Sequence, residues 1–187
     1  MRKLIMWNLV TLDGFFEGLE SWALDFHQTV WGEELERFSV EQLRTADLLF
    51  FGRVTYEGMA AYWQTAPPGE VADFMNRLPK VVFSRTLERA DWANTTLVKD
   101  NAAAAVQKLK SEGDRNIFVF GSANLSAYLM EHSLFDEYRI AVAPVVIGRG
   151  NPLFGRYLSL LRFKLLEARP LSSGGVILRY EPQGSRD

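Results

Sequence analysis

Short apolar runs with the character of β-strands alternate along this chain with segments of helical periodicity, and no other feature limits the possible folds as strongly. Buried strands are predicted at 4–10, 48–51 and 117–120, each closed by a glycine or a turn pair. Apolar residues recur at helical spacing between such runs, as in 33–46 and 102–109. This alternation indicates an α/β fold with a largely parallel sheet and helices on its faces.

Further signals complete a pattern of about eight strands and four or five helices. The other strands are predicted at 81–83, 95–98, 138–147, 163–168 and 176–180. Because a turn-rich connector at 171–175 joins the last two, we expect a C-terminal antiparallel hairpin. Residues 15–32 lack periodicity and are predicted to form a long loop, and such loops are often functional. No repeat, flexible linker or charge block divides the chain, so residues 1–187 are predicted to be a single domain.

The composition excludes several classes of chemistry. The chain has no cysteine, which excludes disulfides, thiolate catalysis and cysteine-bound metals, and its two histidines make a metal site unexpected. The 21 basic and 23 acidic residues give a net charge of −2, which argues against a nucleic-acid partner. Apolar stretches fall far short of the roughly 20 residues that cross a bilayer, and the first residues do not resemble a signal peptide. We therefore expect a cytoplasmic protein without a membrane partner.

Sheets of this class bind ligands outside the carboxyl ends of their strands, where four loops carry small or phosphate-binding residues. These loops are 52–55, 84–86, 121–124 and 148–150. Gly52 allows close backbone approach, Arg53 adds a guanidinium, and Thr55 adds a hydroxyl at the start of a predicted helix. Exposed amides and the helix dipole at such a position suit a phosphate. Alternatively, Gly52 only forms a turn and Thr55 only caps the helix.

Two more of these loops offer phosphate contacts of a different kind. Ser84 and Arg85 supply the hydroxyl and guanidinium expected for a second phosphate, such as the 2′-phosphate of NADP, although Arg85 could also be an ordinary surface residue. The segment 121–125 reads as strand, small-residue turn and helix, which either holds a pyrophosphate or permits tight packing. The glycines of 148–155 are misspaced for a dinucleotide fingerprint.

Two acids are candidates for catalysis. Asp13 ends the first strand, and Asp25 lies between Trp22 and Phe26, whose apolar side chains would raise its pKa. The alternatives are that Asp13 forms a turn and that Asp25 caps a short helix. His27 is too isolated in the sequence to be identified as a ligand.

Five motifs follow one another along nearly the whole chain. They are Leu12-Asp13-Gly14, Gly52-Arg53-Val54-Thr55-Tyr56-Glu57, Val82-Phe83-Ser84-Arg85, Phe120-Gly121-Ser122 with Leu125, and Pro144 through Gly148-Arg149-Gly150-Asn151-Pro152-Leu153-Phe154. Their order and spacing resemble the dihydrofolate reductase-like superfamily, and specifically the C-terminal reductase domain of the bifunctional riboflavin-biosynthesis deaminase-reductase and its stand-alone relatives.

The resemblance implies a mostly parallel, mixed eight-stranded sheet with NADPH lying across the strand ends. It implies that the cofactor is bound by Val10, Gly14, Gly52, Arg53, Thr55, Ser84, Arg85, Gly121, Ser122, Ala123, Asn124 and Leu125. The substrate cleft is expected to be lined by Trp7, Trp22 and Phe26, with Asp25 and Asp13 as the catalytic candidates. Within it, hydride would pass to a pterin-like, pyrimidine or ribosylamino-pyrimidine small molecule.

Two further expectations concern activity and assembly. The alternative to a reductase is a non-catalytic nucleotide- or pterin-binding protein on the same fold. Members of the family that the chain resembles are commonly dimeric. If Trp31, Phe135 and Tyr157 lie at the surface, they would expose more apolar area than a small protein usually does. A homodimer is therefore expected.

Overall fold

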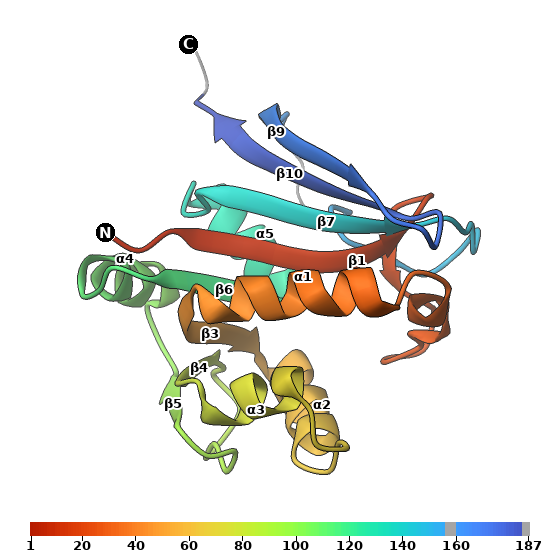
Figure 1. Cartoon of the computed structure of the whole chain (residues 1–187). Helices are drawn as coiled ribbons and strands as arrows, with labels where there is room; N and C mark the ends of the chain where they lie inside the picture. Colours follow the sequence, from red (N-terminus) through yellow and green to blue (C-terminus); the bar gives the residue numbers. More distant parts are fainter. Residues whose placement is uncertain (156–159, 185–187) are drawn as a thin grey trace.

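The computed structural model describes residues 1–155 and 160–184 and contains an eight-stranded sheet (Figure 1). The strands are β1 (Leu4–Thr11), β2 (Phe15–Glu17), β3 (Ala46–Gly52), β4 (Lys80–Phe83), β5 (Thr95–Val98), β6 (Asn116–Phe120), β7 (Glu137–Ala143), β8 (Asn151–Pro152), β9 (Arg162–Pro170) and β10 (Val176–Gln183). The sheet has the order β5-β4-β3-β6-β1-β7-β10-β9, and β2 pairs with β8 separately. Neighbouring strands from β5 to β7 are parallel, whereas β10 and β9 are antiparallel additions. The predicted mixed sheet and C-terminal hairpin are confirmed.

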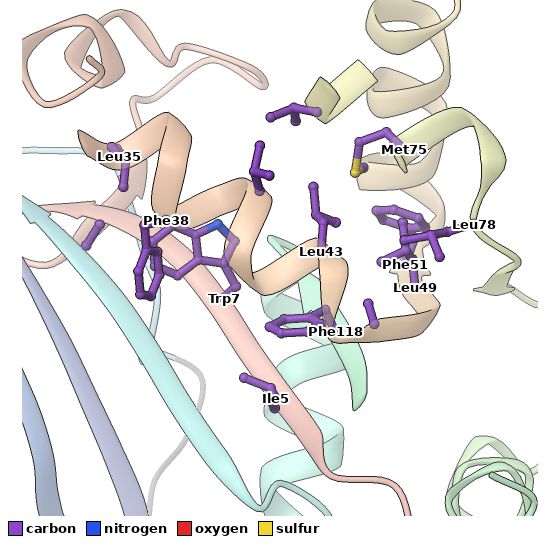
Figure 2. Packing of buried hydrophobic residues seen from close by; sticks show 14 of the residues in the cluster. Ile5, Trp7, Leu35, Phe38, Leu43, Leu49, Phe51, Met75, Leu78 and Phe118 are labelled. Carbon is purple, nitrogen blue, oxygen red and sulfur yellow. The ribbon is translucent and has the colours of Figure 1, made fainter. Parts of the chain in front are cut away.

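Helices cover both faces of this sheet. They are α1 (Glu33–Arg44), α2 (Arg53–Trp63), α3 (Glu70–Arg77), α4 (Ala102–Ser111) and α5 (Ala123–Glu131), with a short 3-10 helix, η1 (Asp25–Thr29). Strand β1 is buried between the two layers because its alternate side chains point to opposite faces. Ile5 and Trp7 point to the face that α1 covers, where Trp7 packs on Phe38 as Figure 2 shows, whereas Leu4 and Met6 pack with α4 and α5 on the other face. The sheet therefore forms the middle layer of three.

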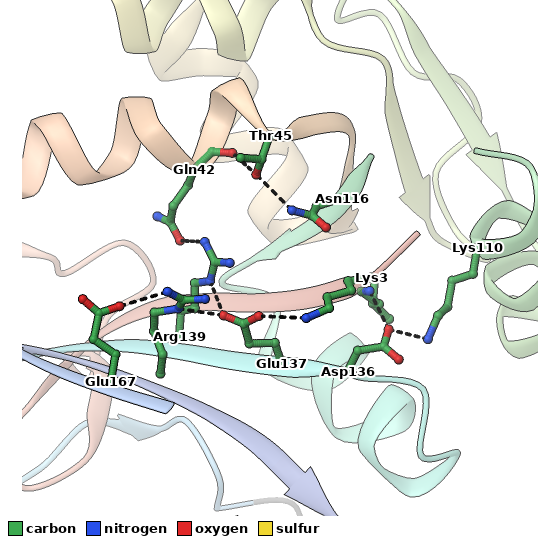
Figure 3. Close-up of polar contacts among 11 residues, drawn as sticks. Lys3, Gln42, Thr45, Lys110, Asn116, Asp136, Glu137, Arg139 and Glu167 are labelled. Atoms are coloured by element: carbon green, nitrogen blue, oxygen red, sulfur yellow. Dashed lines mark hydrogen bonds and ion pairs between the residues drawn. The ribbon is translucent and has the colours of Figure 1, made fainter. Parts of the chain in front are cut away.

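A buried ionic network joins the antiparallel strands to β7 (Figure 3). Glu137 accepts hydrogen bonds from Nε of Arg139 at 2.7 Å and from Nε of Arg179 at 2.8 Å. Arg179 also donates to Glu167 at 2.9 Å. Burial alone would raise the pKa of Glu137, but the hydrogen bonds from the two arginines outweigh burial and hold that pKa below its ordinary value. Glu137 is therefore ionised at neutral pH.

Three local predictions differ from the structure. The strand predicted at 138–147 ends at Ala143, because Pro144 has no amide proton for the sheet. The predicted loop 15–32 contains β2 and η1. Helix α2 begins at Arg53, two residues before the predicted start at Thr55. These differences lie at element ends and in the segment without periodicity, where sequence patterns are least informative.

The apolar residues that suggested self-association have different environments. Trp31 is exposed, but Phe135 is 4% exposed and packs on the Tyr138 ring with centroids 5.2 Å apart. Phe135 was thus wrongly assigned to the surface, and Tyr157 lies outside the described residues. The expected homodimer stays a prediction. Within the described parts of the chain, no helix combines the length and apolar character that crossing a membrane requires.

Candidate functional site

The carboxyl ends of β3, β4 and β5 lie next to one another and are followed by basic residues. The three strands are parallel, and their last residues pair in register. Arg53, Ser84 and Lys99 are the next residues along each strand, so their backbones start from positions about 4.8 Å apart between neighbouring strands. Arg85 follows one residue later. This edge of the sheet therefore gathers three cationic side chains and a hydroxyl.

A set of hydrogen bonds fastens the end of β3 to the turn after β6. The amide of Gly52 donates to Ser122 Oγ at 2.9 Å, and the amide of Ser122 donates to Thr55 Oγ1 at 3.0 Å. Gly121 and Ser122 both have positive φ, 54° and 58°, which turns the chain sharply between β6 and α5. Gly52 and Ser122 therefore serve the scaffold first. The Thr55 hydroxyl accepts one bond and still has its own proton to donate.

Three helices begin at this edge. The N-cap residues of α2, α4 and α5 are Gly52, Asn101 and Ser122, and none of them makes a side-chain capping bond. The first amides of each helix have no partner within the helix, and the helix dipole makes these ends electropositive. All three ends open on the same cavity. Such an arrangement suits a ligand with several negative charges.

The cavity has a volume of about 1260 Å³ and runs from the basic strand ends to the space between β1, α1 and α3. It exceeds the roughly 300–1,000 Å³ of a typical small-molecule site, so it has room for a dinucleotide together with a second ligand. The predicted site residues that line it are Trp7, Trp22, Gly52, Arg53, Thr55, Ser84, Arg85, Gly121, Ser122, Ala123, Asn124 and Leu125. Three of the four predicted loops thus converge on one cavity.

The fourth predicted loop and two predicted residues lie apart from the cavity. The carboxylate of Asp13 accepts hydrogen bonds from the amides of Gly148 at 2.8 Å and of Ile147 at 3.4 Å. Hydrogen bonding by the Thr11 hydroxyl, and then by these amides, lowers the pKa of Asp13, so this exposed acid is ionised and holds two loops together. Gly14 forms the adjoining turn with φ of 88°. Neither Asp13 nor Gly14 borders the cavity.

Three other predicted site residues also lie outside the lining of the cavity. The side chain of Val10 is buried on the α4–α5 face of the sheet. Phe26 is buried in the core beside α1, and Asp25 at the start of η1 is exposed. Trp22 and Phe26 do not enclose Asp25, because Phe26 is buried in the core, Asp25 is exposed, and the Trp22 ring lies against Gly58 of α2. Asp25 therefore lacks the apolar surroundings that its proposed role required.

Trp22 closes part of the cavity from the side of the loop before η1. Its backbone has φ of 68°, and its amide donates to Glu17 Oε2 at 3.0 Å. The indole lies directly against Gly58 in α2, where any side chain would overlap the ring. The loop therefore reaches from β2 to α2 across the cavity.

Sequence reasoning missed several residues that line the cavity, chiefly Asn8, Gln42, Lys99 and His27. Asn8 and Gln42 fall on an apolar strand and an amphipathic helix, where no motif marks them. Lys99 directly follows a predicted strand, so the rule that located Arg53 could have found it. Burial lowers the pKa of His27 to about 4, so its imidazole is neutral at physiological pH.

A mostly parallel eight-stranded sheet, helices on both faces and a cavity at the strand ends define a dihydrofolate reductase-like fold. Residues 2–177 match the model of the RibD C-terminal domain, and the chain belongs to that family. The uncharacterized protein YyaP of Bacillus subtilis (strain 168) is 30% identical over 193 residues, which cover 98% of this chain and 96% of YyaP.

Two solved structures extend the likeness at the level of the fold. A protein from Shewanella sp. PV-4 named for riboflavin biosynthesis superposes with a TM-score of 0.81 at 20% identity, over 97% of this chain and 99% of that one. Dihydrofolate reductase from Enterococcus faecalis, complexed with NADP(H), superposes with a TM-score of 0.65 at 11% identity, over 97% and 96% of the two chains. The predicted resemblance is confirmed.

Proposed function

We propose that the chain is an NADPH-dependent reductase that transfers hydride to a pterin-like, pyrimidine or ribosylamino-pyrimidine small molecule. The observation that carries this proposal is the meeting of three helix N-termini and three cationic side chains at one cavity. A dinucleotide with a pyrophosphate and a 2′-phosphate has the matching charge. Membership of the RibD C-terminal domain family supports the reductase class.

The residues present fit such a cofactor. The amides at the start of α5, from 123 to 125, would receive the pyrophosphate, and Arg53, Ser84, Arg85 and Lys99 would surround the 2′-phosphate. In the free protein Arg53 Nη1 pairs with Glu57 Oε2 at 3.0 Å, but this pair is exposed and therefore weak. A phosphate can thus compete for the guanidinium.

The reduced nicotinamide would supply the hydride, and the protein would orient the reactants and exclude water. The apolar side chains of Leu43, Met59, Trp63, Val71 and Met75 line the end of the cavity remote from the basic strand ends. They would hold a flat organic ring there while the cofactor phosphates occupy the other end.

Thermal denaturation tests this assignment. We expect NADPH to raise the melting temperature substantially more than NADH does, because Arg53 and Arg85 favour the extra phosphate. Arg53→Ala is expected to weaken NADPH binding by about 1.5–3 kcal/mol, the value of a charged hydrogen bond. Arg89→Ala is the matched control, because Arg89 is exposed and pairs only locally with Asp91. Equal shifts with the two nucleotides, or none, would contradict the proposal.

A non-catalytic binding protein is the second candidate, and one observation favours it. The α1 residues that line the cavity are Ser39, Gln42 and Leu43, none of which is an acid that could donate a proton. Absorbance of the reduced nicotinamide with pterin, pyrimidine and ribitylamino compounds separates the candidates. A steady loss of that signal with any compound eliminates the non-catalytic alternative.

A further inference from the structure

The part of the cavity between β1, α1 and α3 has apolar walls and a few polar groups. Leu43, Val71 and Met75 supply the apolar surface, and Ser39 and Gln42 supply the polar groups on α1. The Ser39 hydroxyl already donates to the carbonyl of Leu35 at 2.8 Å. Gln42 is therefore the α1 side chain that can take part in recognising a ring bound there.

The orientation of the Gln42 amide follows from its neighbour. Gln42 is 3% exposed, and its Oε1 accepts a hydrogen bond from Arg139 Nη1 at 3.2 Å, as Figure 3 shows. A guanidinium has only donors, so it is the amide oxygen and not the nitrogen that must face Arg139. The hydrogen bond from Arg139 is the only one that the Gln42 side chain makes to any residue within 1–155 and 160–184, so its Nε2 group has no partner there. Gln42 thus has a free donor and a fixed acceptor.

Arg139 is itself held firmly, which prevents the Gln42 amide from turning over. Its Nε donates to the buried carboxylate of Glu137 at 2.7 Å, and its guanidinium lies 5.3 Å from the centre of the Phe118 ring. A planar guanidinium fixed on two sides keeps its Nη1 group directed at Gln42. Arg139 is therefore a positioning residue for the Gln42 side chain.

We propose that Gln42, oriented by Arg139, selects the ring of the substrate by donating a hydrogen bond to a carbonyl oxygen on that ring. The cavity then prefers oxo-substituted rings to rings whose corresponding position carries an amino group, because an amino group would face the Gln42 donor. The inference deepens the proposed function by naming the substrate class, but it concerns binding alone.

Two probes of equal size test the preference. Pteridine-2,4-dione carries carbonyl groups where 2,4-diaminopteridine carries amino groups, and both can be titrated by fluorescence into the full chain without cofactor. We expect the dione to bind at least tenfold more tightly. Equal binding, or tighter binding of the diamine, would overturn the inference.

Gln42→Glu tests the residue itself. A carboxylate at this position accepts hydrogen bonds from amino groups, so we expect the ratio of the two dissociation constants to shift by at least tenfold toward the diamine. Gln107→Glu, on the exposed side of α4, introduces the same charge away from the cavity and is expected to leave the ratio unchanged. An unchanged ratio in Gln42→Glu would refute the assignment.

Gln42→Met decides the question if Gln42→Glu does not fold. Methionine keeps the length and removes the donor, so dione affinity is expected to fall about tenfold with no gain for the diamine. A fall of less than twofold overturns the inference. NADPH binding is measured separately on the same variants, so failure of the cofactor assignment is distinguishable from failure of ring selection.

Discussion

Replacing Glu137 by glutamine tests the energetic role of the buried network. The Glu137 side chain is 2% exposed and lies between Arg139 and Arg179. Removing one charge from a buried pair costs about 3–5 kcal/mol, because the partner is left buried and unpaired. Arg179 keeps Glu167 at 2.9 Å, whereas Arg139 has no other carboxylate at ion-pair distance in the described structure. The Arg139 guanidinium is thus left buried without a carboxylate partner, and we expect the free energy of unfolding to fall by about 3 kcal/mol.

Urea denaturation at pH 7 measures this loss. With a slope of about 1–3 kcal/mol/M, the midpoint is expected to fall by about 1–3 M at unchanged slope. Glu181→Gln is the control, because Glu181 forms an exposed pair with Lys164 at 2.9 Å on the neighbouring strands. Its effect is expected to stay within about 0.5 kcal/mol. Equal effects of the two substitutions would refute the reasoning.

The pH dependence of the same variant provides an independent check. Because the pKa of Glu137 in the folded protein lies below 4.5, its contribution is fully present above that value. It is lost as the pH falls through the folded pKa. The difference in stability between the native protein and Glu137→Gln is therefore expected to narrow in acid, and a constant difference would contradict the assignment.

Three further substitutions probe the cavity and its supports. Burial lowers the pKa of His27 from 6.5 to about 4. Between these pH values the unfolded chain binds this proton and the folded protein does not. The free energy of unfolding is therefore expected to fall by at most about 3 kcal/mol as the pH is lowered from 6.5 to 4. His27→Gln is expected to flatten that part of the pH–stability curve, and an unchanged curve would contradict the assignment. Gly58→Ala is expected to displace the Trp22 indole and shift tryptophan emission to the red; the same shift in a Trp22→Phe background would count against the contact. Thr55→Val removes the acceptor that holds the turn after β6, so a loss of about 1 kcal/mol in urea is expected, with recovery in Thr55→Ser.

The sequence was sufficient for the sheet because its parallel strands are buried on both faces. Runs such as 48–51 and 117–120 are continuously apolar and end at glycines, which makes both their type and their carboxyl ends readable. The basic strand ends could be located for the same reason. Arg53 and Arg85 could be identified as site residues from the predicted ends of their strands alone.

The other end of the cavity could not be predicted, because its residues carry no local signal. The role of Gln42 depends on Arg139, which lies 97 residues away in the sequence. The structure places Asp25 on the surface and Phe26 in the core, because the position of η1 depends on its contacts with β7, which neighbouring residues do not encode. Local sequence patterns therefore predicted the cavity residues at the carboxyl ends of the strands, but not those that line the cavity between β1, α1 and α3.

The position of β1 has a consequence for how the chain acquires its structure. Leu4 pairs with Ile117 and Ile5 pairs with Glu137, so both neighbours of this central strand are made more than 100 residues after it. During synthesis this highly apolar segment therefore has no strand partner on either side, and its backbone hydrogen-bonding groups stay unpaired. Such a state favours aggregation and slows folding. Complete pairing of β1 with β7 therefore cannot occur before residue 143 has been synthesised.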